Sequence, residues 1–153
     1  MIQATSVTIK FQDFTALYEL SCTIPKGCIY GMVGSNGAGK STFLRLLAGV
    51  YRPDGGTITI DDEPVYENPG VKKRIAYVPD ELYFLPASNI RRMAALYQAA
   101  YPDFDRQRFD SLMSIFRLSI SKSLNTFSKG MRRQATTILA ISCRPDYIFF
   151  DET

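Results

Sequence analysis

Short runs of alternating apolar and polar residues mark the first part of the chain. In the stretch SVTIKF, Val7, Ile9 and Phe11 fall on one face and the polar residues between them fall on the other, which is the pattern of a half-buried strand. Similar stretches occur at 21–24 (SCTI) and 57–61 (TITID). These three segments predict a small antiparallel sheet.

Two other segments are short and almost wholly apolar. CIYGMVG (28–34) predicts a strand that is buried on both faces, as in a parallel sheet. YIFFD (147–151) predicts a second buried strand, and residues 75–78 predict another short one. Between the predicted strands at 28–34 and 75–78, residues 41–50 predict a helix that ends at RPDGG.

The middle of the chain has a helical period. Apolar residues recur at i, i+3, i+4 and i+7 in two sets, and each set predicts an amphipathic helix whose stripe faces the core: Ile90, Met93, Ala94 and Tyr97, and then Phe109, Leu112, Met113 and Phe116. A third helix is predicted at 129–142. The order of elements indicates a mixed α/β fold with a helical insertion at about 81–127.

Composition narrows the class of protein. The 153 residues are 46% hydrophobic and 22% charged, which is ordinary for a globular domain with one core. The net charge of +3 is not gathered in a basic tail, so it gives no indication of nucleic-acid binding. We see no signal-peptide layout and no apolar run long enough for a membrane span, and we expect a cytosolic protein. The three cysteines have no metal-site spacing and are expected to be buried thiols.

The clearest motif is a phosphate-binding loop. GSNGAGKST fits G-x-x-x-x-G-K-[ST], in which glycines let backbone N–H groups surround a phosphate and the following helix directs its positive end to the same place. Lys40 would contact the outer phosphates and Ser41 would ligate Mg²⁺. A ligand-free glycine turn is the alternative, but the predicted strand before the motif and the helix after it favour nucleotide binding. The residues assigned to the nucleotide are Gly34, Ser35, Asn36, Gly37, Ala38, Gly39, Lys40, Ser41 and Thr42.

Two carboxylates end the last predicted strand. Paired with a phosphate loop upstream, Asp151 is expected to hold Mg²⁺, directly or through water, opposite Ser41. Glu152 is expected to orient and deprotonate the attacking water. Two acids that merely end a strand in solvent are the alternative.

A third motif brings in a family resemblance. FSKGMRRQ (127–134) predicts a helix start, with Ser128 as the N-cap. Together with the phosphate loop and the terminal acids, in this order, it resembles the ATP-binding domains of ABC transporters over essentially the whole chain. The resemblance implies a P-loop NTPase core with a small antiparallel β subdomain and a helical insertion.

The resemblance also implies roles for single residues. Phe11 stands where the family has an aromatic that stacks on adenine, although the stripe of Val7 and Ile9 places it equally in the core. Ser128 and Gly130 would clamp the γ-phosphate of an ATP held by a second ATP-binding subunit, in a head-to-tail dimer. Catalysis would involve Lys40, Asp80 and Glu152.

Several positions depart from the family's pattern. The third motif stands where the family has its signature sequence before a helix. Here it reads Phe-Ser-Lys-Gly-Met, so only Ser128 and Gly130 match the essential part of the signature. The glutamine expected after IAYVP is replaced by Asp80, whose carboxylate could still reach Mg²⁺ or its water. The signature and the stretch AAYPDFDRQRF look most like those of exporter ATPases whose membrane helices are a separate chain.

Family members continue past DET into an aspartate loop, a further strand and a histidine, whereas this sequence contains no histidine. We interpret the chain as the N-terminal part of an ATPase subunit, with an incomplete core sheet. Unpaired backbone groups inside that sheet would be costly, so this piece alone is expected to hydrolyse ATP poorly at best.

The interpretation is therefore an ATPase subunit that binds MgATP, works with transmembrane permease subunits and lies at the inner face of the membrane through them. A GTPase is not indicated, because the Asn-Lys-x-Asp guanine motif is missing. A soluble ABC-superfamily ATPase of the DNA-repair or translation type, and a nucleotide-binding module without hydrolysis, stay open. Arg132 and Arg133 are expected to be a solvated helix face rather than a nucleic-acid contact.

Overall fold

The structure is a computed structural model that describes residues 1–151, and it divides into two compact units. The first unit runs from Met1 to Lys72, and the second begins at Lys73. Each unit is described by itself below.

The first unit is built on a four-stranded antiparallel sheet with the strand order β2-β1-β3-β4. This confirms the antiparallel sheet predicted from the alternating segments, although the strands are longer than the segments. Alternate residues of β1 and β3 are buried, as expected for a sheet with one covered face. The strands are β1 (Ile2–Phe11), β2 (Phe14–Ile24), β3 (Gly55–Ile60) and β4 (Glu63–Pro64).

Irregular pairing interrupts β1 and β2. Ser6 and Glu19 have left-handed backbones, with φ of 48° and 46°, and the register between the two strands shifts near both. Side-chain hydroxyls take up the N–H groups at these points: Ser21 Oγ accepts from Ser6, and Thr8 Oγ1 accepts from Glu19. The bulges therefore leave neither amide unsatisfied.

The strand predicted at 28–34 is not formed. The segment has no regular structure, it pairs with no strand among residues 1–151, and Ile29 and Val33 are fully exposed. Apolarity alone predicted the strand, but a buried strand also needs a ladder partner for its backbone groups. Cys28 is exposed for the same reason, so the expectation that every cysteine is buried was wrong.

Helix α1 (Lys40–Leu47) follows the phosphate loop and is shorter than predicted. It ends in a Schellman motif, in which the N–H of Gly49 bonds the carbonyl of Leu46 and the N–H of Val50 bonds that of Arg45. Gly49 has a φ of 65°, which suits glycine at this position. A four-residue helix, α2 (Pro69–Lys72), closes the first unit.

The second unit contains a pair of parallel strands, β5 (Ile75–Val78) and β6 (Tyr147–Phe150), with Ile75 opposite Tyr147. Both lie where the sequence predicted strands. Side chains of β6 are less buried than expected, since only Phe149 is fully buried. The main helix of the unit, α5 (Lys129–Ser142), packs against β5.

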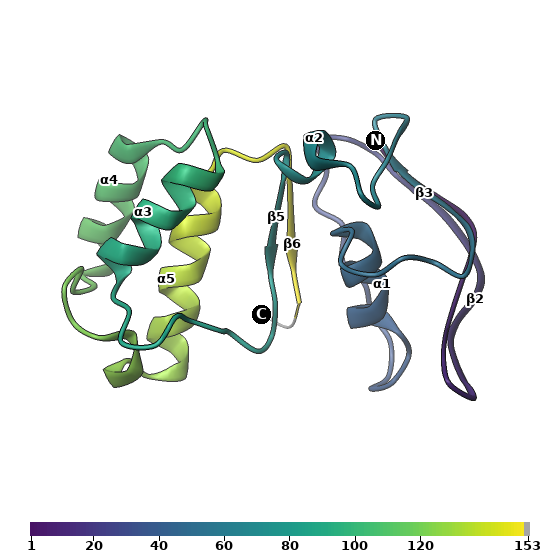
Figure 1. Cartoon of the computed structure of the whole chain (residues 1–153), viewed down its shortest axis with the longest axis horizontal. Helices are drawn as coiled ribbons and strands as arrows, with labels where there is room; N and C mark the ends of the chain where they lie inside the picture. The colour runs from purple at the N-terminus through teal and green to yellow at the C-terminus, as the bar shows by residue number, and fades with distance from the viewer. Residues whose placement is uncertain (152–153) are drawn as a thin grey trace. The chain divides into compact units, whose positions relative to one another are not determined.

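Helices α3 (Ile90–Ala100) and α4 (Arg106–Phe116) pack on α5, as Figure 1 shows within this unit. Asn89 and Asp105 cap them, each accepting a bond from the amide three residues on. A short 3-10 turn, Leu124–Thr126, precedes α5. The three helices confirm the helical pattern of the sequence, whereas a separate subdomain at 81–127 stays a prediction.

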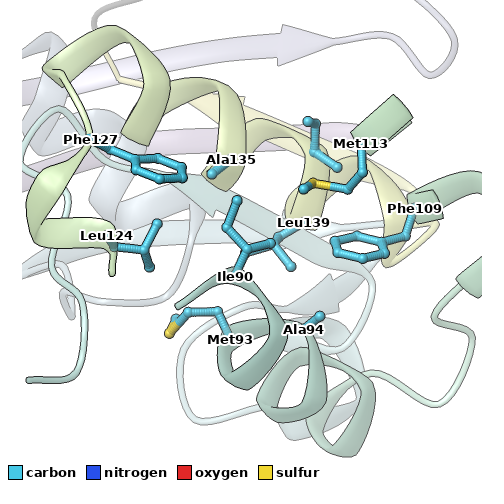
Figure 2. Close-up of a cluster of buried hydrophobic side chains, with 10 residues drawn as sticks. Ile90, Met93, Ala94, Phe109, Met113, Leu124, Phe127, Ala135 and Leu139 are labelled. Carbon is cyan, nitrogen blue, oxygen red and sulfur yellow. The ribbon is translucent and has the colours of Figure 1, made fainter. Parts of the chain in front are cut away.

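The predicted helical stripes meet in one apolar cluster (Figure 2), except for Phe116, which is 44% exposed, so its prediction as a core residue was wrong. Ile90, Ala94 and Phe109 are almost completely buried there, and Leu139 of α5 lies among them. No helix among residues 1–151 is long and apolar enough to cross a membrane.

Candidate functional site

The phosphate loop lies in the first unit and depends on two glycines with left-handed backbones. Gly37 has a φ of 83° and Gly39 a φ of 84°. A Cβ at Gly39 would lie 2.7 Å from the carbonyl oxygen of Ala16 and 2.7 Å from Cδ2 of Leu17, whereas a Cβ at Gly37 would meet nothing within 4 Å. Gly39 is thus required by both conformation and packing, and Gly37 by conformation alone.

Lys40 folds back over this loop. Its Nζ donates hydrogen bonds to the carbonyl oxygens of Gly34 (2.8 Å) and Ser35 (2.9 Å). Another bond, from the N–H of Ala38 to Ser35 O at 3.2 Å, closes a turn inside the loop. The ammonium group has three donors and these contacts use two, so the cation is held at the loop while one donor is left for a phosphate.

The first turn of α1 adds a second electropositive element. Gly39 is its N-cap and has no side chain with which to cap the first amides. The helix N-terminus carries a partial positive charge, and the ammonium of its first residue, Lys40, is held at the loop that precedes it. This combination of helix end, glycine turns and lysine is suited to an anionic phosphate.

Phe11 lies at the end of β1, next to the two-residue turn that leads into β2. Val7 and Ile9 are buried as predicted, but Phe11 is 41% exposed, so its placement in the core was wrong. Its ring meets Tyr51 edge-on, with 5.5 Å between the centroids. An exposed aromatic ring fixed by a neighbour is available for stacking, and the adenine role stays a prediction.

In the second unit, Asp151 follows β6 and is buried. The Tyr77 hydroxyl donates a 3.0 Å hydrogen bond to its Oδ2, and the Asp151 N–H donates to the carbonyl of Val78 at 2.9 Å. A buried carboxylate in this position can hold a cation, and the Mg²⁺ role stays a prediction. Glu152, the predicted base, lies outside the described residues.

The signature residues begin α5. Ser128 is its N-cap, as predicted, and its Oγ accepts a 3.2 Å bond from the N–H of Met131. Gly130, in the first turn, is exposed, and a Cβ there would approach only the Ser128 hydroxyl, at 4.0 Å. Packing within the unit therefore gives no reason for glycine at this position.

Asp80, two residues beyond β5, is bonded to α5. Arg133 Nη2 donates to its Oδ1 at 2.9 Å and to its carbonyl oxygen at 3.0 Å, and Lys129 Nζ lies 3.7 Å from Oδ1. Arg132 Nε donates to the carbonyl of Phe127. The Arg133 side chain is only 19% exposed, so the expectation of a solvated arginine face was wrong for Arg133.

Comparison with known proteins now decides the family. A family model described as ABC transporter matches residues 17–153. The chain belongs to the ABC transporter family. The ABC transporter ATP-binding protein YtrB of Bacillus subtilis is 31% identical over 152 residues, which are 99% of this chain and 52% of YtrB. The daunorubicin/doxorubicin resistance ATP-binding protein DrrA of Streptomyces peucetius is 35% identical over 97% of this chain and 47% of its own length.

Two solved structures share the fold of this ABC family chain. An ATP-binding subunit of an ABC transporter has a TM-score of 0.89 at 23% identity, covering 99% of this chain and 65% of that one. An ATP-binding cassette solved as a dimer with ADP and Pi has a TM-score of 0.83 at 20% identity, covering 98% and 73%. The α/β P-loop fold class is thereby confirmed. The chain spans about half the length of YtrB.

Within each unit of this ABC family member, the structure groups some predicted residues. In the first unit, the loop at 34–39 leads directly into the first turn of α1, which contains Lys40, Ser41 and Thr42. In the second unit, Asp80 is bonded to α5. Sequence reasoning missed two partners, Tyr77 and Arg133. Tyr77 carries a polar tip in an otherwise apolar strand, and Arg133 lies one helical turn after Lys129, which were the available signals.

Proposed function

We propose that this chain is the ATP-binding part of an ABC transporter ATPase, which hydrolyses ATP to power transport of a substrate across a membrane. The observation that carries the proposal is the phosphate loop, in which Gly39 is sterically required and Lys40 is held at the loop by its carbonyls. A loop of this kind binds the phosphates of a nucleotide through backbone amides and one mobile cation.

Different residues bind the phosphates, the metal ion and the adenine of MgATP. Lys40 and the first turn of α1 hold the β- and γ-phosphates, and the Ser41 hydroxyl ligates Mg²⁺. Asp151 supplies the carboxylate for the metal, directly or through water, and Phe11 stacks on the adenine. Ser41 and Asp151 supply oxygen ligands of the type that Mg²⁺ prefers, and Phe11 supplies an aromatic face for the adenine.

Hydrolysis follows from Glu152 as the base. Water attacks the γ-phosphorus, Glu152 takes the proton from it, the bond to the β–γ bridging oxygen breaks, and ADP and phosphate leave. Ser128 and Gly130 of a second subunit close over the γ-phosphate. A Cβ at Gly130 would meet only the Ser128 hydroxyl, so there is space for such a phosphate to approach the backbone. The similar cassette with ADP and Pi was solved as a dimer, which supports a second subunit.

Transport requires transmembrane permease subunits, to which the ATPase binds at the inner face of the membrane. The relatives' names include both Nod factor export and sulfate/thiosulfate import, so they assign no single cargo or direction. The exporter likeness of the signature favours export.

The test is calorimetric titration of the 153-residue chain with MgATP. We expect binding that Lys40→Ala removes and Lys122→Ala retains, because both variants lose one lysine charge but Lys122 lies in the other unit. Equal binding by both variants would contradict the proposed site. A separate phosphate-release assay, with Glu152→Gln as the control, then distinguishes hydrolysis from binding alone.

A further inference from the structure

Asp80 and Arg133 form a partly buried ion pair in the second unit. The Arg133 side chain is 19% exposed and that of Asp80 37%, whereas Lys129, which approaches the same carboxylate oxygen, is 82% exposed. Sheltered charges are screened less by water and salt than exposed ones. Arg133 therefore makes the stronger contact, and Lys129 adds a weaker one.

The geometry fixes backbone as well as side chain. One guanidinium nitrogen, Nη2, donates both to the Asp80 carboxylate (2.9 Å) and to the Asp80 carbonyl oxygen (3.0 Å). A contact with two atoms of one residue restrains its main chain as well as its carboxylate. Lysine has a single point-like cation and does not offer the same planar donor group.

The pair joins two parts of the candidate site. Asp80 follows the carboxyl end of β5, where Val78 also accepts the N–H of Asp151. Arg133 lies in α5, whose N-cap is Ser128. The end of β5 that contacts Asp151 is thus tied directly to the helix that begins at the signature.

We propose that Arg133 is a positioning residue, which uses Asp80 as an anchor to hold the first turns of α5, and with them Ser128 and Gly130, in place. Two cations already attend the Asp80 carboxylate, and their positive charge disfavours a divalent cation there. Asp80 then acts as an anchor and not as a Mg²⁺ ligand. The role of Ser128 and Gly130 at a γ-phosphate rests on the proposed function. The anchoring of α5 by Asp80 and Arg133 does not depend on it.

The first test is amide hydrogen exchange in the full 153-residue chain. Arg133→Gln and Lys129→Gln each remove one cation from the same carboxylate. We expect exchange at residues 132–136 to become at least about tenfold faster in Arg133→Gln and to change less than about twofold in Lys129→Gln, with α4 amides as the reference. Asp80→Asn should raise the exchange rate at these residues as much as Arg133→Gln does. In the double variant Asp80→Asn/Arg133→Gln, exchange should be no faster than in either single variant. Additive effects, or no effect of Arg133→Gln, would overturn the anchor.

The second test separates positioning from general stability. MgATP affinity of the single chain should be unchanged in Arg133→Gln, while dimerisation with a non-hydrolysable MgATP analogue weakens by about tenfold or more. Arg133→Lys should recover part of that dimerisation. Unchanged dimerisation would refute the positioning role.

The third test concerns the metal. Under the anchor proposal, the Mg²⁺ concentration needed for half-maximal ATP binding is the same in Asp80→Asn, Arg133→Gln and the unmodified chain. A higher requirement in Asp80→Asn alone would overturn the proposal and assign Asp80 to the metal. If no form of the chain binds ATP, the proposed function fails, and the exchange experiment still decides for or against the anchor.

Discussion

The hydroxyl of Tyr77 donates a 3.0 Å hydrogen bond to Oδ2 of Asp151, joining a side chain of β5 to the acid that follows β6. Asp151 is buried, so the bond offsets part of the cost of removing its carboxylate from water. We expect Tyr77→Phe to lower the free energy of unfolding by about 1.5–3 kcal/mol, the range for hydrogen bonds to charged groups. Urea denaturation measures the change.

Tyr101→Phe is the matched control, because the Tyr101 hydroxyl donates to a neutral acceptor, the carbonyl of Ile75, at 3.2 Å. Its loss should cost about 0.5–1.5 kcal/mol. If both variants lose the same stability, the carboxylate of Asp151 gains nothing particular from Tyr77.

The phosphate loop gives a second matched pair. Gly37→Ala and Gly39→Ala both place a side chain on a left-handed backbone, at φ of 83° and 84°, which costs about 1–2 kcal/mol each. Only Gly39→Ala adds a methyl group 2.7 Å from Ala16 O and Leu17 Cδ2. We expect Gly39→Ala to be the more destabilising by at least about 1 kcal/mol in thermal or urea unfolding. Equal losses would mean that the loop relaxes away from β2.

Burial raises the pKa of the Cys143 thiol to about 12. At pH 8 the reactive thiolate is therefore scarce, and the side chain is also inaccessible. Iodoacetamide at pH 8 should modify the exposed Cys28 in the folded chain and Cys143 only after unfolding in urea. Peptide mass spectrometry distinguishes the two sites. Equal labelling in the folded chain would show that α5 opens readily.

The same raised pKa predicts a pH dependence of stability. The folded state holds the Cys143 proton more tightly than the unfolded state, whose ordinary thiol pKa is 9.0. The contribution of this tighter proton binding to the free energy of unfolding is fully present below about pH 9 and is lost as the pH rises toward 12. Burial also raises the pKa of Tyr97 to about 12, so it acts in the same direction. Cys143→Ala should lose less stability than the unmodified chain between about pH 8 and pH 10.5; an equal loss would contradict the assignment.

The sequence predicted the elements whose apolar residues find partners nearby. The stripes of Ile90 and Phe109 gave α3 and α4, and Ser128 marked the start of α5, because helix period and capping are local properties. The strand at 28–34 was wrong because strand formation depends on a distant partner that apolarity does not reveal.

The candidate site was predictable to a similar extent. A motif such as the phosphate loop carries its own geometry, since its glycines and lysine act through the local backbone. Arg133 and Tyr77 act through residues 53 and 74 positions away, so no local pattern could pair them with Asp80 and Asp151. Arg133 also shows why two adjacent arginines on a helix cannot be assumed to face solvent.

Gly130 gives a prediction in which stability and function change in opposite directions. A methyl group there meets only Ser128 Oγ, at 4.0 Å, so Gly130→Ala should stabilise α5 by up to about 1 kcal/mol through the higher helix propensity of alanine. The same methyl group would occupy the space through which a second subunit's γ-phosphate approaches. We therefore expect a higher melting temperature together with weaker dimerisation in a non-hydrolysable MgATP analogue, measured by sedimentation velocity. A variant that is more stable and dimerises normally would remove Gly130 from the proposed phosphate clamp.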